Sequence, residues 1–140
     1  MFPVSTRGRY AVRILTCLAS GGRGETVTKR RIAESEAISP DYIEQILLSL
    51  KAAGLVRSHR GRLGGFSLAR APEQITLARI LEATDGPVAP APCLQEGQTC
   101  DRAGACPTRP VWQKAGESVQ AVLDETTLAD LAEPAEEPTH

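Results

Sequence analysis

Apolar residues near the start of the chain recur at the spacing of an α-helix. In residues 5–20 they fall at i, i+4, i+7 and i+8, on one helix face: Tyr10, Ile14, Cys17 and Leu18. Ser5 is a preferred N-cap residue, and three closely spaced glycines follow the segment. The pattern predicts a first helix in which Cys17 packs as a small hydrophobic residue rather than as a ligand.

Two more helices and a hairpin follow. Thr28 opens a short helix over residues 28–33. Ser39, Pro40 and Asp41 then supply an N-cap, a proline at the first helical position and an acid in the first turn. The third helix ends at Gly54, which suits a left-handed residue after a helix, and it buries four apolar residues at helical spacing: Ile43, Ile46, Leu47 and Leu50.

After Gly54 the spacing of apolar residues changes from the period of a helix to that of a strand. Residues 55–59 and 66–69 read as two short strands, and the basic, glycine-rich segment 60–65 reads as the turn between them. Three helices followed by a two-stranded hairpin form a winged helix-turn-helix, in which helices two and three are the helix-turn-helix and the hairpin is the wing.

The second half of the chain has less regular structure. Thr76 caps a fourth predicted helix that ends near residue 84, and residues 85–110 are a loop rich in proline and glycine. A long helix follows over residues 108–123, with a short turn at 127–131. The fold class is therefore mainly α with a small β-hairpin: a winged helix-turn-helix plus a long C-terminal dimerisation helix.

This organisation divides the chain into four parts. Residues 1–84 are the predicted winged helix-turn-helix domain, and 85–107 are a cysteine-bearing loop. Residues 108–131 hold the dimerisation helix and a short terminal turn, and 132–140 read as a disordered acidic tail.

The long C-terminal helix carries one apolar stripe. Its members are Trp112, Ala115, Val119, Val122 and Leu123. Because the pattern predicts no later element to cover this stripe, we expect it to pack on the same helix of a second chain. The alternative is packing on its own domain. A two-fold homodimer would place its two recognition helices in successive major grooves of a pseudo-palindromic operator, roughly 34 to 36 Å apart.

Charge is segregated between the halves. Residues 1–70 hold 12 Lys and Arg against 5 Asp and Glu, whereas residues 71–140 hold 4 against 12, so a net charge of −1 conceals +7 followed by −8. Clustered cations bind polyanions and release their counterions. We therefore expect the first half to bind double-stranded DNA.

Particular residues are the candidates for that contact. The third helix offers its N-terminal end to a major groove, with Glu44 and Gln45 able to read cytosine and adenine, and the wing offers arginines to a minor groove. Lys29, Arg30 and Arg31 are expected at phosphates. The full predicted set is Lys29, Arg30, Arg31, Ser39, Pro40, Asp41, Tyr42, Glu44, Gln45, Arg60, Gly61 and Arg62.

Several other classes of protein are disfavoured. Membrane spans need about 18 or more uncharged apolar residues, and Arg13 interrupts the apolar stretch near the start, so we expect no membrane segment and a cytoplasmic protein. Five scattered aromatic residues do not form a stacking platform for single strands. The sequence also holds no Ser/His/Asp or Cys/His set and no glycine-rich phosphate loop, so we do not expect an enzyme.

Three of the four cysteines share the central loop. Cys93, Cys100 and Cys106 follow a C-x6-C-x5-C spacing. In a reducing compartment such thiolates are better explained as a ligand set than as disulfides, and they suit an iron-sulfur cluster or zinc.

Four segments together resemble the IscR/NsrR/RirA group of bacterial winged-helix iron-sulfur regulators. These are VSTRGRYAVR at 4–13, ISPDYIEQIL at 38–47, the wing residues LV, RG and GGF at 55–66, and ITL with ILEA at 75–83. The match covers about residues 3 to 131. The resemblance implies a homodimeric transcription factor that senses iron, nitric oxide or redox state through a cluster held by Cys93, Cys100 and Cys106.

The chain departs from that group at the fourth cluster ligand. IscR-like members have a histidine three residues after the last cysteine, where this chain has Arg109, and NsrR-like members have an aspartate near the start of helix one, where it has Arg9. Glu96, Asp101 or an exchangeable small molecule remain as candidates. Lacking the histidine, the chain favours 4Fe-4S slightly over 2Fe-2S. The alternative is a thiol- or zinc-based regulator without a cluster.

Overall fold

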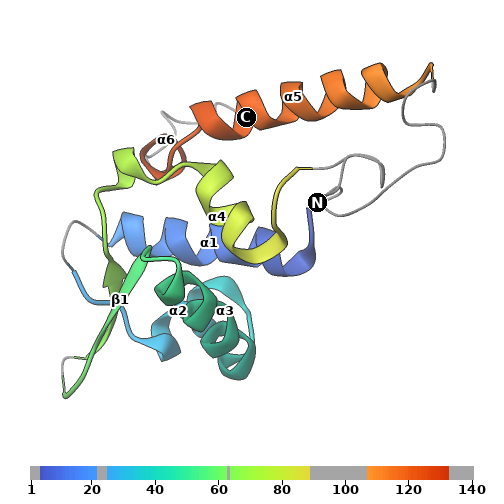
Figure 1. The fold of residues 1–140 in the computed structure, drawn as a ribbon. Coiled ribbons are helices and arrows are strands. Elements are labelled where there is room, and N and C mark those ends of the chain that lie inside the picture. The colour runs from blue at the N-terminus through green and yellow to red at the C-terminus, as the bar shows by residue number, and fades with distance from the viewer. Residues whose placement is uncertain (1–3, 22–24, 63, 89–106, 133–140) are drawn as a thin grey trace, which may run out of the picture.

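The computed structural model describes residues 4–21, 25–62, 64–88 and 107–132 of the protein (Figure 1). In chain order its elements are α1 (Thr6–Ser20), α2 (Lys29–Glu36), α3 (Pro40–Ala52), β1 (Val56–His59), β2 (Gly65–Leu68), the 3-10 turn η1 (Pro72–Gln74), α4 (Leu77–Asp85), α5 (Arg109–Glu125) and α6 (Leu128–Ala132). The predicted fold class is confirmed. The turn η1 was not predicted.

Side-chain caps set the helix starts. Before each of four helices a hydroxyl accepts a hydrogen bond from the backbone N–H three residues further on: these are Ser5, Thr28, Ser39 and Thr76. Each such bond satisfies a donor that the helix itself leaves unpaired. All four predicted starts are confirmed. At the other end of α3, Gly54 has a φ of 77°, in the left-handed region expected of a glycine after a helix.

The hairpin forms in the predicted place with slightly shifted ends. Strands β1 and β2 are antiparallel, with Val56 opposite Leu68 and His59 opposite Gly65. A bridge between Val27 and Phe66 ties the hairpin to the segment before α2, through two backbone hydrogen bonds of 2.8 Å each. Strand β2 of the wing is therefore attached to the segment that leads into α2.

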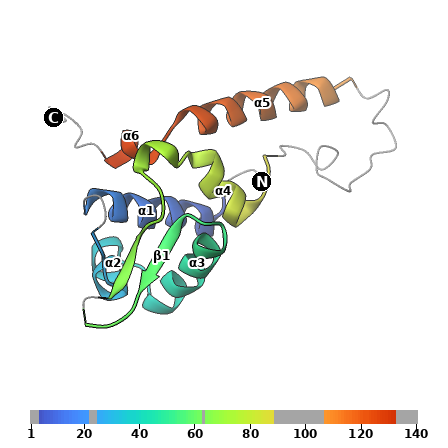
Figure 2. The same ribbon diagram turned by 60° about the vertical axis from the view of Figure 1, so that its left-hand side comes forward.

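One core unites the helices and the hairpin. Its fully buried side chains come from α1, α2, α3, α4 and the chain around the hairpin, and α1 runs through its centre (Figures 1 and 2). On α1 the predicted stripe is confirmed at Ile14 and Leu18, whereas Tyr10 and Cys17 are only partly buried. The same core includes Leu128 of α6, which is 0% exposed.

The C-terminal part of the chain returns to this core. After α5, Leu128 donates its N–H to the carbonyl oxygen of Ile75 and Leu77 donates to that of Thr126, each over 2.9 Å. Residues 126–132 therefore complete the N-terminal domain rather than extending the long helix α5. The long helix α5 lies across α4, and none of the described helices is long and apolar enough to span a bilayer.

Candidate DNA-binding interface

The exposed face of α3 holds most of the predicted reading residues. Its N-terminal end is exposed at Ser39, Pro40 and Asp41, and one turn later Glu44 and Gln45 are exposed as well. The opposite face is buried through Ile43, Ile46, Leu47 and Leu50. The helix is thus anchored by one side and presents polar side chains on the other, as a recognition helix requires.

Glu44 has a partner that the sequence did not reveal. The Nζ atom of Lys29 lies 3.5 Å from Glu44 Oε2, and both side chains remain partly exposed. An ion pair of this kind contributes little to stability. It does orient the carboxylate on the α3 face, and it brings a predicted phosphate contact and a predicted base contact side by side.

The other two basic residues of α2 point in different directions. Arg30 pairs with Glu34 one turn away, at 3.2 Å, and its side chain is 90% exposed. Arg31 instead lines a groove of about 500 Å³ between α1 and α2, together with Cys17 and Glu36. Arg30 is therefore accessible to a phosphate, as predicted. Arg31 lies beside the groove between α1 and α2.

Tyr42 belongs to the packing between α1 and α3. Its ring meets the Tyr10 ring edge to face, with centroids 5.7 Å apart, and the guanidinium of Arg13 lies 5.3 Å from the Tyr10 centroid. The ring therefore supports α3 from behind. Contact of Tyr42 with DNA stays a prediction.

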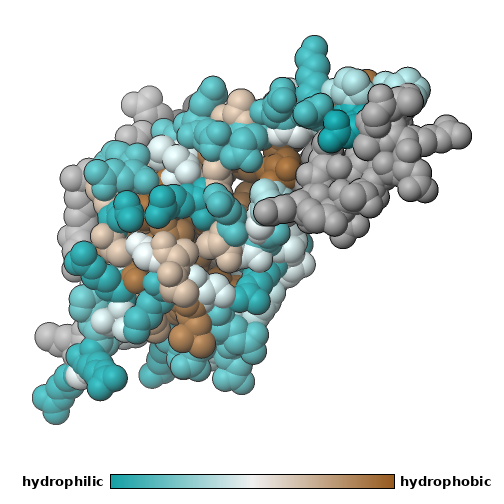
Figure 3. Space-filling view, in the orientation of Figure 1, coloured by the Kyte–Doolittle hydropathy of each residue, from teal (hydrophilic) through white to brown (hydrophobic). Residues whose placement is uncertain are grey.

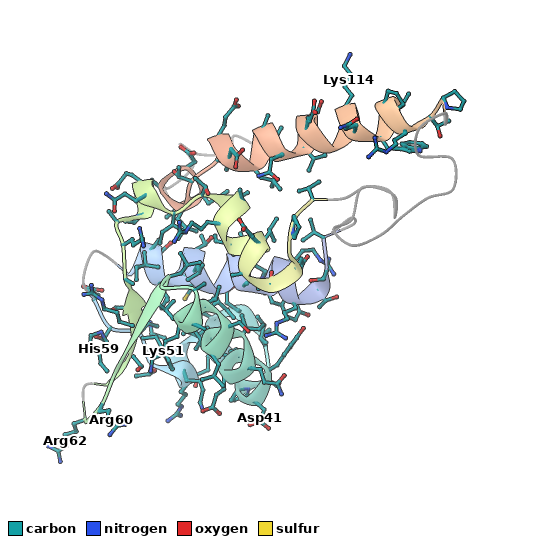
Figure 4. All side chains as sticks on the ribbon, in the orientation of Figure 1. Asp41, Lys51, His59, Arg60, Arg62 and Lys114 are labelled. Atoms are coloured by element: carbon teal, nitrogen blue, oxygen red, sulfur yellow. The ribbon has the colours of Figure 1, made fainter. Side chains whose placement is uncertain are left out.

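The wing tip presents its arginines to solvent. Arg60, Gly61 and Arg62 are exposed, and Figure 4 shows Arg60 and Arg62 projecting from the tip of the hairpin on the same side of the molecule as Asp41 of α3. Gly61 has a φ of 96°, which favours glycine. The two predicted contact regions, α3 and the wing, therefore face one way.

Two glycines make the turn and its attachment possible. A Cβ on Gly64 would lie 2.5 Å from the carbonyl oxygen of His59, and a Cβ on Gly65 would lie 2.4 Å from that of Val27. Gly65 also has a φ of 146°. No side chain fits at either place, so these positions hold the wing at its angle to the body.

Sequence reasoning missed Lys51 and Arg57 as members of this surface. Lys51, in the last turn of α3, donates from Nζ to Ser58 Oγ over 2.9 Å, and Arg57 is exposed on β1. In the sequence, a lysine in the last turn of a helix is explained by its favourable interaction with the helix C-terminus. Only the hydrogen bond to Ser58 on β1 shows that Lys51 joins α3 to the wing. On the hairpin itself, His59 Nε2 and Ser67 Oγ are 2.7 Å apart.

Polar contacts tie the start of α1 to both α3 and α4. Arg7 donates from its guanidinium to Ser49 Oγ on α3. Ser5 donates its backbone N–H to Asp85 Oδ2 over 3.0 Å and its hydroxyl to Asp85 Oδ1 over 2.5 Å. Because Asp85 is the last residue of α4, these bonds place the root of the cysteine-bearing loop beside α1, and α1 beside the recognition helix.

The predicted dimerisation stripe of α5 is exposed at Trp112, Ala115 and Val122 and half-buried at Val119 and Leu123. Val122 is 60% exposed and Trp112 is 42% exposed, and Val111 beside them is also exposed. Gly116 faces inward and is buried, and Leu123 is half-buried at a groove shared with α4. Figure 3 shows apolar surface just below this helix. The stripe therefore packs in part on its own domain, through α4, while Trp112, Ala115 and Val122 stay exposed in the described part of the chain.

The three loop cysteines, Cys93, Cys100 and Cys106, lie outside the described residues, as do Glu96 and Asp101. Of the cysteines only Cys17 is described, and it is half-buried. Burial raises the pKa of its thiol and Glu36 adds to this, against a hydrogen bond from Ser35 and the charge of Arg31, which lower it. Its partial exposure on a groove differs from the full burial expected of a core residue.

Comparison with known proteins agrees with this geometry. The family model Rrf2, described as an iron-dependent transcriptional regulator, matches residues 4–134. The chain belongs to the Rrf2 family. The resemblance inferred from the sequence motifs is thereby confirmed, and with it a DNA-binding transcriptional regulator.

Individual Rrf2-family relatives cover most of the chain. The regulator CymR of Bacillus subtilis is 38% identical over 130 residues, which are 92% of this chain and 88% of the relative. Its solved structure, titled as the global cysteine regulator of that organism, gives a TM-score of 0.79 and covers 94% of this chain and 97% of that one at 37% identity. The structure of T. potens IscR gives 0.78 at 35% identity, covering 99% and 92%.

Proposed function

We propose that this Rrf2-family regulator binds a pseudo-palindromic operator as a homodimer, with α3 in the major groove and the wing arginines in the adjacent minor groove. The observation that carries the proposal is the common orientation of α3 and the wing: Asp41 and the two tip arginines face the same side of the molecule (Figure 4). A groove-binding helix and a basic loop on one side can contact one duplex together.

The homodimer part of the proposal rests on α5. Its exposed stripe runs along a 17-residue helix, and four of the five most exposed large hydrophobic residues of the described chain lie on α5 or α6. A second copy of α5, packed against the first about a two-fold axis, would remove both stripes from water at once.

The sensing part of the proposal assigns Cys93, Cys100 and Cys106 to an iron-sulfur cluster, 4Fe-4S by slight preference. A described residue close in sequence to this set is compatible with it. Arg109 opens α5 three residues after Cys106, and its Nε is a buried donor with no hydrogen-bond partner. The first turn of α5 also holds no acidic side chain. A cation at the positive end of a helix suits an anionic thiolate set.

When bound, the cluster would supply a centre that reacts with oxidants or nitric oxide and depends on available iron. The protein's own residues would carry the consequence to DNA. Asp85 holds the root of the loop to Ser5, and Arg7 joins the same helix to Ser49 on α3. We propose that ordering of the loop changes the placement of α3 through these contacts.

Anaerobic native mass spectrometry of the full chain tests dimer and cluster together. We expect the mass of a dimer that carries iron and sulfide, and we expect replacement of the three loop cysteines by serine to remove that added mass while leaving the dimer. A colourless protein with stoichiometric zinc would instead support the thiol- or zinc-based alternative.

Coupling is tested by comparing the cluster-loaded and cluster-free protein on one duplex at one salt concentration. We expect their dissociation constants to differ, and to become equal in the triple-serine variant. Equal affinity of the two wild-type forms would contradict the sensing proposal while leaving DNA binding untouched.

A further inference from the structure

One large hydrophobic side chain of the winged helix-turn-helix domain is exposed to solvent. Leu48 of α3 is 63% exposed, more than any other exposed large hydrophobic residue of the described chain. The other four belong to α5 or α6, at Val111, Trp112, Val122 and Leu131. Leu48 is therefore set apart from the stripe assigned to the dimer.

The position of Leu48 on α3 is that of a reading residue. It lies four residues after Glu44 and three after Gln45, so it continues the exposed face that those two begin one turn earlier. Seven residues before it, Asp41 lies on the same face. Leu48 thus lies on the face of α3 that carries the predicted reading residues, one turn further from the helix N-terminus.

The surroundings argue for DNA over a protein partner. Leu48 is flanked on its exposed face by Asp41, Glu44, Gln45 and Lys51, all polar and exposed. One leucine among charges is too small a patch to bind a protein, which needs several hundred Å² of contiguous apolar surface. In the major groove, by contrast, a single apolar side chain has a matched target.

The chemistry then fixes the target. Leucine neither donates nor accepts a hydrogen bond, so Leu48 gains nothing from a phosphate or from the polar edge of a base. The C5-methyl group of thymine is the apolar group that base pairs present in the major groove. We infer that Leu48 reads a thymine in each half-site by packing against this methyl group. The inference deepens the proposed function and rests on α3 lying in the major groove.

Exchange of thymine for deoxyuridine isolates that contact, because it removes the methyl group and nothing else. The operator is first selected from random duplexes with the full-length wild-type protein, and each thymine of one half-site is then replaced in turn. We expect one replacement to raise the Kd about fourfold, the worth of one buried methyl group. Other positions should change the Kd little.

Variants then assign the effect to Leu48. We expect Leu48→Ala to bind the thymine and deoxyuridine duplexes equally, and Leu48→Met, which keeps an apolar side chain of similar volume, to retain the preference. Gln74→Ala, which changes an exposed residue of η1 outside the proposed DNA and dimer contacts, should behave as wild type. Folding is not at risk in Leu48→Ala, because the side chain is exposed and alanine favours a helix.

The outcomes are distinct. If Leu48→Ala still prefers thymine at the sensitive position, or if no thymine is sensitive in the wild type, the assignment of Leu48 is wrong while the proposed DNA-binding function stands. If Leu48→Ala weakens all duplexes equally, Leu48 has no part in reading sequence. If the wild-type protein selects no duplex at all, both proposals fail.

Discussion

At the scale of single residues, the wing depends on positions where only glycine fits. Gly65 is the clearest case, because its φ of 146° and the nearby carbonyl oxygen of Val27 each exclude a Cβ. Gly54 differs, since its φ of 77° is equally left-handed but nothing lies within 4 Å of the place where a Cβ would be. Substitutions at Gly54 and Gly65 therefore distinguish the cost of backbone strain alone from the cost of strain combined with a steric clash.

We predict that Gly65→Ala lowers the free energy of unfolding by about 2 to 4 kcal/mol, because it adds a clash with Val27 to the strain of the backbone. Gly54→Ala should cost only about 1 kcal/mol, from strain alone. Urea denaturation followed by circular dichroism measures both. Equal losses in the two variants would show that the predicted clash with Val27 adds no cost to the backbone strain.

Cys17 gives a prediction about reactivity. Since burial raises the pKa of its thiol, a smaller fraction is thiolate near pH 8 than in an unfolded chain, and the thiolate is the nucleophile. We expect iodoacetamide to alkylate Cys17 more slowly in the folded protein than in urea, with the difference shrinking as the pH rises above the folded pKa. Peptide mass spectrometry at Cys17 follows the reaction, and identical rates would contradict the assigned pKa direction.

The residue scale is also where sequence reasoning had its limits. The exposure of Glu44 and Gln45 follows from helical spacing and was predicted. The pairing of Glu44 with Lys29 was not, because it joins two helices whose crossing is set by the core between them. The same holds for Tyr42, whose ring finds Tyr10 on another helix.

At the scale of elements, the wing is expected to act through charge. Arg60 and Arg62 project from its tip, whereas Lys114 projects from α5 on the opposite side of the molecule (Figure 4). We predict that Arg60→Ala or Arg62→Ala weakens binding to every duplex and lowers the slope of log K against log salt by about one. Fluorescence anisotropy at several salt concentrations measures this slope.

Lys114→Ala is the matched control, since it removes one positive charge away from the proposed contact. Its salt slope should equal that of the wild type. A slope that falls as much for Lys114→Ala as for Arg60→Ala would mean that overall charge, rather than the wing, governs the salt dependence.

Caps and turns made the elements predictable. The starts of α1, α2, α3 and α4 each follow a Ser or Thr that bonds three residues ahead, an interaction local enough to be visible in the sequence. The bridge from Val27 to Phe66 was missed because its partners are far apart in the chain. The same reason hid the return of α6 to the core.

At the scale of the whole molecule, the prediction concerns assembly. We expect Val122→Glu to convert the dimer to a monomer, because it places a charge at the most exposed large hydrophobic residue of α5. Sedimentation velocity measures the mass, and the affinity for a two-half-site duplex should fall with it. Glu117→Ala, which changes an exposed residue on another side of α5, should stay dimeric. A dimeric Val122→Glu protein would place the interface elsewhere.

The sequence by itself determined the helices, their starts, the hairpin, the basic first half and the two faces of α3, since each depends on spacing and on contacts within a few residues. Tertiary structure decided the rest: which arginine of α2 faces a groove, how Lys51 joins α3 to the wing, how Asp85 and Arg7 connect α4, α1 and α3, and why α6 belongs to the core. These depend on the packing of distant segments, because the direction of a side chain follows from the helix crossings that a shared core imposes.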